Sequence, residues 1–360
     1  MFLTKLDRYI MKKFLGTFVF MLVLLMSIAI VFDLSEKLND FIDEGAPWGQ
    51  IIGIYYSNFF IYFGVQFSYM LNFISVIWFT SKMAGNTEIV PILSAGVGFN
   101  RFLRPYIFSS IILVVWAILM YNYVLPISNK SRLEFEELYY RAKTSKANEH
   151  IQLNDNEIVY YQNYNGVSRH ITNLTYEKWK SEPRVYEYTL TAASAVGDSL
   201  SNKWQLFNFE IRYFSEFNDS IIRRGFADTT LVFGIEDLVF RSEVIEAMNN
   251  TELDAFIEEQ KRKGSDSIAS YEIEKYNRWA SPFAIIILTV IGVSVASKKS
   301  RGGLGLNLAV GLSVCVLYIF SMKITTVAAV NVGFTPALAV WLPNIIFAFI
   351  ALFLYRIAPK

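Results

Sequence analysis

Cysteine and histidine are almost absent from this chain of 360 residues, which contains one cysteine and two histidines. The single cysteine, Cys315, cannot form an internal disulfide and excludes a cysteine-based metal site. His150 and His170 belong to no H-E-x-x-H spacing and to no ligand cluster, so we interpret them as surface or strand residues. The sequence therefore predicts no metal ion.

Nucleotide-binding and nucleophile motifs are also missing. The chain has no G-x-x-x-x-G-K-[ST] loop, no nucleophile elbow and no glycine-rich dinucleotide fingerprint. We therefore expect no catalytic residue, no cofactor and no ATP hydrolysis by this chain. Energy-driven work would need a separate subunit that brings the nucleotide.

An excess of charge of either sign is lacking as well, with 33 basic residues against 32 acidic ones. Such a balance creates no field that would recruit nucleic acid, so we expect no nucleic-acid partner. Apolar residues, in contrast, make up 53% of the chain, too large a share for one soluble core to bury. The composition indicates a membrane protein.

The first half of the predicted membrane part covers residues 1–126. Residues 1–13 form an interfacial helix that leads into a charge-free span over residues 14–32, long enough to cross a hydrocarbon core. The following loop is acidic and therefore faces outward. We divide the next apolar stretch into an interfacial segment near 48–58 and a second span near 60–81. A third span runs from about Pro105 to Leu125 and ends at Pro126.

Residues 127–276 have the composition of a soluble domain, which this topology places outside. A charged helix over 128–147 continues the third span. Five segments rich in β-branched and aromatic residues follow, and their spacing suggests a sandwich or jelly-roll. A helical hairpin then begins near Thr251, pauses at Gly264 and returns to the membrane.

Residues 277–360 contain three further predicted spans, at about 279–296, 304–325 and 337–355. Lys298, Lys299 and Arg301 form a basic turn after the first of them, which places that turn and both chain ends on the inner side. We therefore expect an α-helical bundle of six transmembrane helices, with a periplasmic, β-jellyroll-like domain inserted between helices 3 and 4.

A polar, glycine-punctuated interval over residues 84–105 lies between the second and third spans. It predicts a short helix over about 87–96, with Thr87 as N-cap and Glu88 in the first turn. Three apolar residues share one face and a glycine ends the helix: Ile89, Ile92, Leu93 and Gly96. The helix either rests on lipid headgroups or fills a groove of a cytosolic protein.

Three cations at the outer level are candidates for an anionic lipid headgroup: Lys37, Arg278 and Lys323. Their alternative interpretation is anchoring at the interface, where long basic side chains reach the headgroups. Two small-residue pairs, at 292/296 and 311/315, would let helices four and five approach their neighbours closely.

Three strings of the sequence resemble the LptF/LptG permease family, the transmembrane subunits of the lipopolysaccharide export ABC transporter. They are LDRYI (6–10), TEIVPILSAGVGFNRFLRP (87–105), and YNRWASPFA (276–284) followed by GVSVASKKSRGG (292–303) and WLPN (341–344). The resemblance covers the whole chain, and the LDRYI opening favours the G-type member. The second string, with Glu88 and Gly96, is similar to the family's coupling helix.

The resemblance implies a bacterial inner-membrane protein with cytoplasmic termini, paired with a second LptF/LptG-type permease. It also implies an LptB-type ATPase dimer on the coupling helices, an LptC-type periplasmic bridge protein and lipopolysaccharide as the transported lipid. One departure concerns the outer end of the first span, where family members carry basic residues and this chain keeps only Lys37 among acidic residues.

Two other classes of function compete with a permease. The chain could be a membrane-anchored periplasmic interaction protein, in which case the outer domain would keep its activity on an unrelated anchor. A secondary transporter is disfavoured, because the spans contain no paired acidic residues for ion coupling and no matching broken helices.

Overall fold

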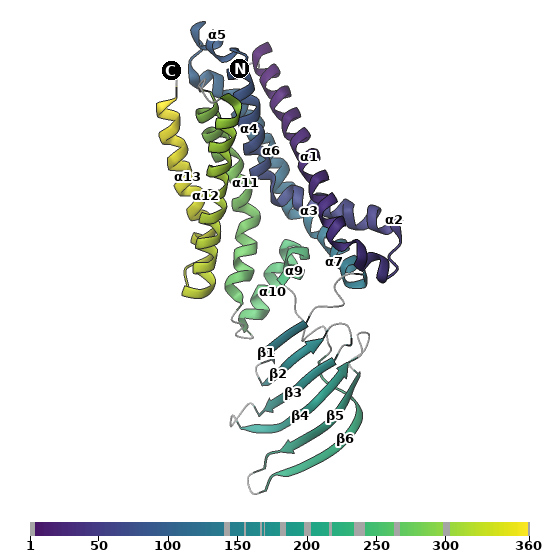
Figure 1. Ribbon diagram of the computed structural model, residues 1–360. Coiled ribbons are helices and arrows are strands. Elements are labelled where there is room, and N and C mark those ends of the chain that lie inside the picture. The colour runs from purple at the N-terminus through teal and green to yellow at the C-terminus, as the bar shows by residue number, and fades with distance from the viewer. Residues whose placement is uncertain are drawn as a thin grey trace.

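The structure, a computed structural model, describes residues 4–139, 145–154, 156–165, 168, 170–180, 185–197, 203–215, 218–233, 242–262, 267–297 and 303–358. A bundle of long helices and a separate antiparallel sheet lie at opposite ends of the molecule (Figure 1). Both chain ends lie at the end of the bundle that is far from the sheet (Figure 1).

The first half of the bundle begins with one very long helix, α1, over Lys5–Asp43. The helical elements that follow are α2 (Trp48–Gln50), η1 (Ile51–Tyr56), α3 (Ser57–Gln66), α4 (Ser68–Gly85), α5 (Ile89–Ser94), α6 (Phe99–Leu119), η2 (Met120–Val124) and α7 (Leu125–Tyr139). The elements named η are π-helical turns. The segments that cross the bilayer stay helical because a backbone group there has no water to bond with.

The second predicted span is bent. Residues 48–66 and 68–85 are helical and meet at 69°. The break lies at Phe67, whose backbone leaves the helical region. The structure thus moves the division of this apolar stretch from about residue 59, as the sequence predicted, to Phe67.

The third predicted span does not end at Pro126, because α6, η2 and α7 form one continuous helical run. A proline inside a helix clashes with the carbonyl four residues earlier, which is that of Asn122. The widened π-helical turn over 120–124 contains this residue and gives the carbonyl room. Proline therefore marks an irregularity here and not the end of the helix.

The second half of the bundle contains α9 (Ser242–Ala247), α10 (Asn250–Arg262), α11 (Ile268–Ala296), α12 (Gly303–Val332) and α13 (Pro336–Ile357). Among the described residues, five helices are long and apolar enough to cross a membrane, and the bent pair brings the number to six. This confirms the predicted fold class of membrane helices with an inserted β-rich domain. The basic turn with Lys298, Lys299 and Arg301 lies outside the described residues.

The inserted domain contains one sheet of six antiparallel strands in sequential order. They are β1 (Ser145–Asn154), β2 (Glu157–Asn165), β3 (His170–Trp179), β4 (Tyr186–Gly197), β5 (Lys203–Tyr213) and β6 (Ser220–Thr230). β1 lies where the sequence predicted the end of a charged helix. Trp204 and Tyr161 are among the buried side chains of the sheet core. Burial raises the pKa of the Tyr161 hydroxyl, which therefore stays neutral.

A crease crosses the whole sheet. Asn148, Asn173 and Asn208 adopt left-handed backbone conformations in β1, β3 and β5. The strand register aligns the three with Gln162 of β2 and Gly225 of β6 in one transverse row. Asparagine tolerates this conformation better than most residues. The side-chain alternation restarts at this row in every described strand from β2 to β5, so the row is a built-in bend of the sheet.

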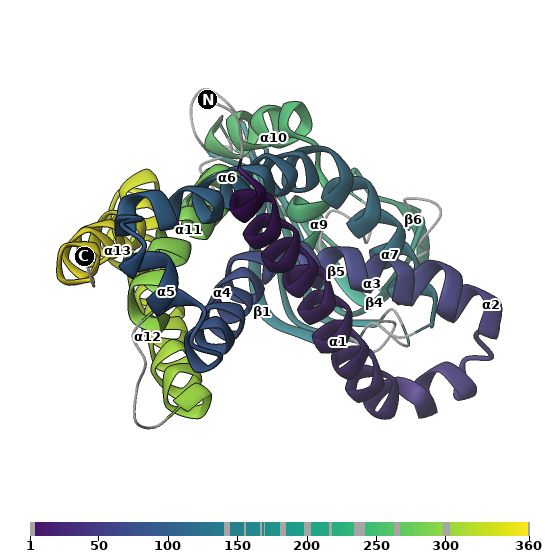
Figure 2. The same cartoon turned by 90° about the horizontal axis from the view of Figure 1, so that it is seen from above.

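Helix α4 packs against α1 on one side and α12 on the other (Figure 2). Its Asn72 side chain donates to Thr289 Oγ1 of α11 at 2.9 Å. Close approach requires glycine at two positions, as the sequence predicted. A Cβ on Gly292 would lie 2.8 Å from Val76 Cγ1, and one on Gly311 would meet Ile77 Cδ1.

We predict that Gly292→Val destabilises the bundle by about 1 to 3 kcal/mol, because the larger side chain overpacks the contact with α4. The matched control is Gly305→Val in α12, where an added Cβ meets no atom within 4 Å. Thermal unfolding of both variants in one detergent measures the effect. Equal unfolding midpoints would contradict the close packing of α11 on α4.

Candidate functional site

The short helix α5 lies at the end of the bundle that also holds both chain ends (Figure 1). Thr87 has a left-handed backbone and does not cap the helix as predicted, because the N-cap is Glu88. The Glu88 N–H donates to Met83 O at 2.9 Å, which ties the start of α5 to the end of α4. Gly96 has φ +84° and its N–H donates to Leu93 O, so it ends the helix as predicted.

The apolar face of α5 is turned mainly toward the protein itself. Ile89 is 2% exposed and belongs to the buried core of the bundle, and Ile92 and Leu93 pack against that core while partly exposed. The apolar residue that α5 presents to solvent is Val90, which is 56% exposed. In this arrangement Ile89 is therefore a structural residue that a partner cannot reach.

Glu88 connects α5 to α1. Its carboxylate accepts a hydrogen bond from the Tyr9 hydroxyl at 3.3 Å and another from Asn86 Nδ2 at 3.1 Å. The side chain stays partly exposed, so the outer part of the carboxylate is open to a partner. Tyr9 lies 79 residues away in the sequence, and the spacing of residues alone could not indicate this contact.

The three predicted lipid-binding cations belong to three different helices, α1, α11 and α12. Lys37 forms an ion pair with Asp33 at 2.7 Å and contacts the Tyr55 hydroxyl at 2.5 Å, with its side chain 13% exposed. Lys323 is exposed on α12. Lys323 is thus open to solvent, whereas the charge of Lys37 is balanced by Asp33 within α1.

Arg278 is completely buried, and its guanidinium bonds to the protein on every side. It donates to Glu274 Oε1 at 3.1 Å, to Ile245 O at 3.0 Å and to Met248 O at 2.8 Å. A second NH1 contact, at 3.1 Å, reaches Asn250 Oδ1. This set of bonds joins α9 and α10 to α11, and it satisfies the charge without a lipid.

A second buried cluster lies where the bundle leads into the sheet. Arg132 pairs with Glu136 at 2.5 Å, bonds to Asn129 and stacks on the Tyr62 ring at 4.4 Å. The Tyr62 hydroxyl donates to Glu246 Oε2 at 2.6 Å. The cluster connects α3, α7 and α9, and it places the Arg132 side chain inside the protein.

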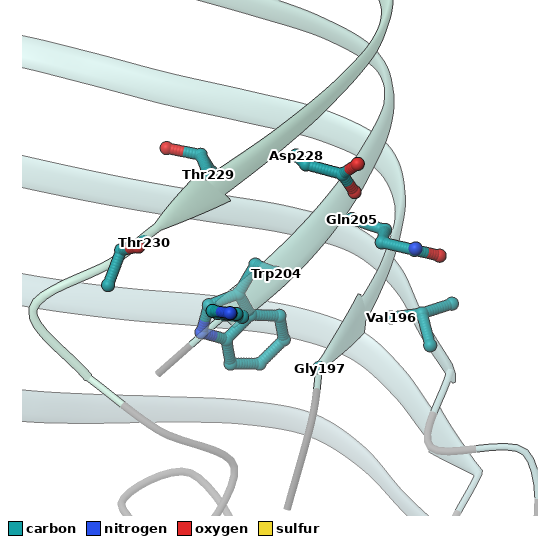
Figure 3. Close-up of a pocket in the computed structure, with 8 residues that line it drawn as sticks. Val196, Gly197, Trp204, Gln205, Asp228, Thr229 and Thr230 are labelled. Atoms are coloured by element: carbon teal, nitrogen blue, oxygen red, sulfur yellow. The ribbon is translucent and has the colours of Figure 1, made fainter. Parts of the chain in front are cut away.

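A cavity of about 630 Å³ lies at the end of the sheet where β4, β5 and β6 meet. Figure 3 shows Gln205 and Asp228 on one side of the sheet and the Trp204 indole on the other. Trp204 donates from Nε1 to Phe233 O at 2.9 Å and is 1% exposed. The indole is therefore part of the core and not a free stacking platform.

We predict that Arg278→Gln lowers the thermal unfolding midpoint strongly, because it breaks a buried ion pair and leaves backbone carbonyls without their donor, a loss of about 3 to 5 kcal/mol. Lys323→Gln, which removes an exposed cation from α12, leaves the midpoint unchanged. Thermal unfolding of the two variants in the same detergent provides the measurement. An unchanged midpoint for Arg278→Gln would show that its buried contacts contribute nothing to stability.

In a comparison with curated protein sequences, none matches this chain. A family model described as lipopolysaccharide export system permease LptF/LptG matches residues 8–357. The match includes the bundle, the inserted sheet and α5, and it agrees with a multi-pass protein of the inner membrane. The chain therefore belongs to the LptF/LptG family, the permease of the lipopolysaccharide export system.

Proposed function

We propose that this chain is a non-hydrolytic transport subunit that extracts lipopolysaccharide from the outer leaflet of the inner membrane and passes it to a periplasmic bridge, driven by a separate cytosolic ATPase. The observation that carries the proposal is the placement of α5 and the sheet at opposite ends of one bundle (Figure 1). A protein that takes up work on one side of a membrane and delivers lipid on the other needs contact surfaces at both ends.

The proposed orientation places α5 and both termini in the cytoplasm and residues 127–276 in the periplasm. The acidic loop around Asp40 and the basic residues near the chain ends support it, since basic residues favour the inner side. The domain division at 126/127 and 276/277 follows from this orientation.

The proposed ATPase contact is the exposed side of α5, which consists of Val90 with the outer parts of Glu88, Ile92 and Leu93. A dimeric LptB-type ATPase would need one groove on each subunit, to receive one coupling helix from each of two permeases. Docking an amphipathic helix into a groove needs only a few apolar anchors and one polar contact to fix its orientation.

The proposed surface for a second LptF/LptG-type permease consists of α1 and α12, the least buried of the candidate spans. Both present large apolar side chains outward, for example Phe32, which is 73% exposed, and Phe320, which is 61% exposed. Lipopolysaccharide would lie between the two subunits. Of the three candidate cations, exposure favours Lys323 for its phosphates, since Arg278 and Lys37 are engaged within the protein.

The proposed bridge contact is the edge of β6, the last strand of the sheet among the described residues and the strand farthest from the helices (Figure 1). Ile221 is 48% exposed, Ile222 42% and Phe226 50%, which is unusual for an edge strand. An LptC-type protein with an exposed strand could extend the sheet there, with main-chain bonds for affinity and apolar side chains for specificity. The other edge strand, β1, lies nearer the helices.

We predict that Glu88→Lys lowers the amount of ATPase that copurifies with the permease by about tenfold, because it reverses the charge of the polar contact at the groove. ATP-driven lipopolysaccharide release then falls in proportion. Copurification in mild detergent measures the effect at equal permease abundance. The matched control is Glu44→Lys, which makes the same change of charge at the C-terminal end of α1. Unchanged copurification and release would disprove the role of Glu88.

We predict that a photocrosslinking residue at Ile222 captures the bridge protein in intact cells, because β6 adds its strand to that protein. Gln152 on β1 is an equally exposed position on the opposite edge of the sheet and gives no product. Immunoblotting of the crosslinked products measures both. Capture from Gln152 but not from Ile222 would place the bridge protein on the β1 edge and reject the proposal.

A further inference from the structure

The first turn of α1 is joined to the first turn of α6 by a bidentate ion pair. Arg101 NH1 lies 2.6 Å from Asp7 Oδ1, and Arg101 NH2 lies 2.6 Å from Asp7 Oδ2. The Asp7 side chain is 5% exposed and that of Arg101 31%. The two residues are 94 positions apart in the sequence, so the pair brings together two separate spans.

Asp7 holds the start of α1 at the same time. Its carboxylate accepts from the Thr4 backbone N–H at 2.8 Å and from the Thr4 hydroxyl at 2.9 Å, which completes a capping box. Arg101 NH2 also reaches Thr4 Oγ1 at 3.2 Å. The helix end and the ion pair therefore share one carboxylate, and α1 cannot move away from α6 without breaking the contacts of Arg101 to Asp7 and Thr4.

The neighbouring turn of α1 contacts α5 through Tyr9 and Glu88. Three elements thus meet at this end of the bundle: α5, where the ATPase is proposed to dock, and the starts of α1 and α6. Figure 2 shows the first turns of α1 beside α6. We call Thr4, Asp7 and Arg101 the α1 latch.

Below the latch, α1 is held less firmly. It is one of the two least buried candidate spans, with a single stripe that includes Ile10, Phe14 and Phe18 in contact with the bundle. An unbroken helix of 39 residues is about 58 Å long. A displacement at its first turns therefore reaches the outer leaflet, where its exposed apolar face lies.

We infer that the α1 latch transmits the movement of the coupling end into α1, so that ATP-driven displacement of α5 and α6 shifts the helix that lines the proposed lipid path. This inference rests on the proposed function. Asp7 and Arg101 are positioning residues in it, because they touch neither lipid nor nucleotide. Partly exposed ion pairs add little to stability, which leaves the geometry of the two helices as the property that the pair controls.

The test uses the full permease complex with its ATPase in proteoliposomes that contain lipopolysaccharide. The measured quantity is lipopolysaccharide released per ATP hydrolysed, together with the ATPase retained per permease. The variants are Asp7→Asn, Arg101→Gln, Arg101→Lys and the exchanged pair Asp7→Arg with Arg101→Asp. Arg8→Gln is the matched control, since it removes an exposed charge from the same turn and leaves the latch intact.

We expect Asp7→Asn and Arg101→Gln to keep the ATPase and its hydrolysis but to lower release per ATP by about threefold or more, within the range of known coupling effects. The exchanged pair restores most of the ratio, which a merely structural role of the capping box would not do. Arg101→Lys keeps the charge but loses the bidentate geometry, so its release per ATP falls between that of Arg101→Gln and that of the wild type. The control retains the wild-type ratio.

A wild-type ratio in both single variants overturns the inference, and so does an exchanged pair as poor as the singles. Loss of bound ATPase also overturns it, because the pair would then belong to the docking surface. Should the single variants not accumulate, Arg101→Lys decides by the same ratio. Absence of ATP-driven release from the wild-type complex rejects the proposed function itself, whereas failure of the latch alone leaves wild-type release intact.

Discussion

The obligation to hydrogen-bond every backbone group inside a bilayer governs this structure. Water is absent there, so each N–H and C=O needs a partner within the chain, and helices provide it. The irregular places of the bundle all obey this rule. Pro126 follows a π-helical turn that keeps the helix continuous, and the bend at Phe67 joins two helical segments directly. A bundle made in this way is continuous from one membrane face to the other, which lets it carry displacement.

The ion pairs at the two ends of the bundle differ in how exposed they are to solvent. At the end next to the sheet, Arg132 and Arg278 are buried and bonded within the protein, which joins the helices that lead into and out of the sheet. Such buried charges add little net stability, yet removing one partner is costly, so they hold a defined arrangement. At the other end, the Asp7–Arg101 pair is partly open to solvent and joins the first turns of α1 and α6. Buried arginines therefore join the helices next to the sheet, and a more exposed ion pair joins the helices next to α5.

The sheet, like the bundle, contains backbone irregularities at defined positions. An antiparallel sheet of six strands twists but does not fold over sharply unless its backbone is altered. The aligned row through Asn148, Asn173 and Asn208 supplies a bend in every second strand at one level. Because the side-chain alternation restarts there, one face remains apolar on both sides of the crease. Among the described residues, β6 is the edge strand on the side of the sheet opposite β1.

The sequence by itself determined the apolar spans, the inserted strands β2 to β6, the glycine that ends α5 and the resemblance to the LptF/LptG family. These features depend on local composition, because hydrophobic length, β-branched content and left-handed glycine are properties of a few neighbouring residues. Only the tertiary structure decided that Ile89 is buried, that Arg278 is bonded on every side and that Asp7 meets Arg101. Each of these depends on segments far apart in the chain, and the choice of partner arises from packing, which no single segment specifies.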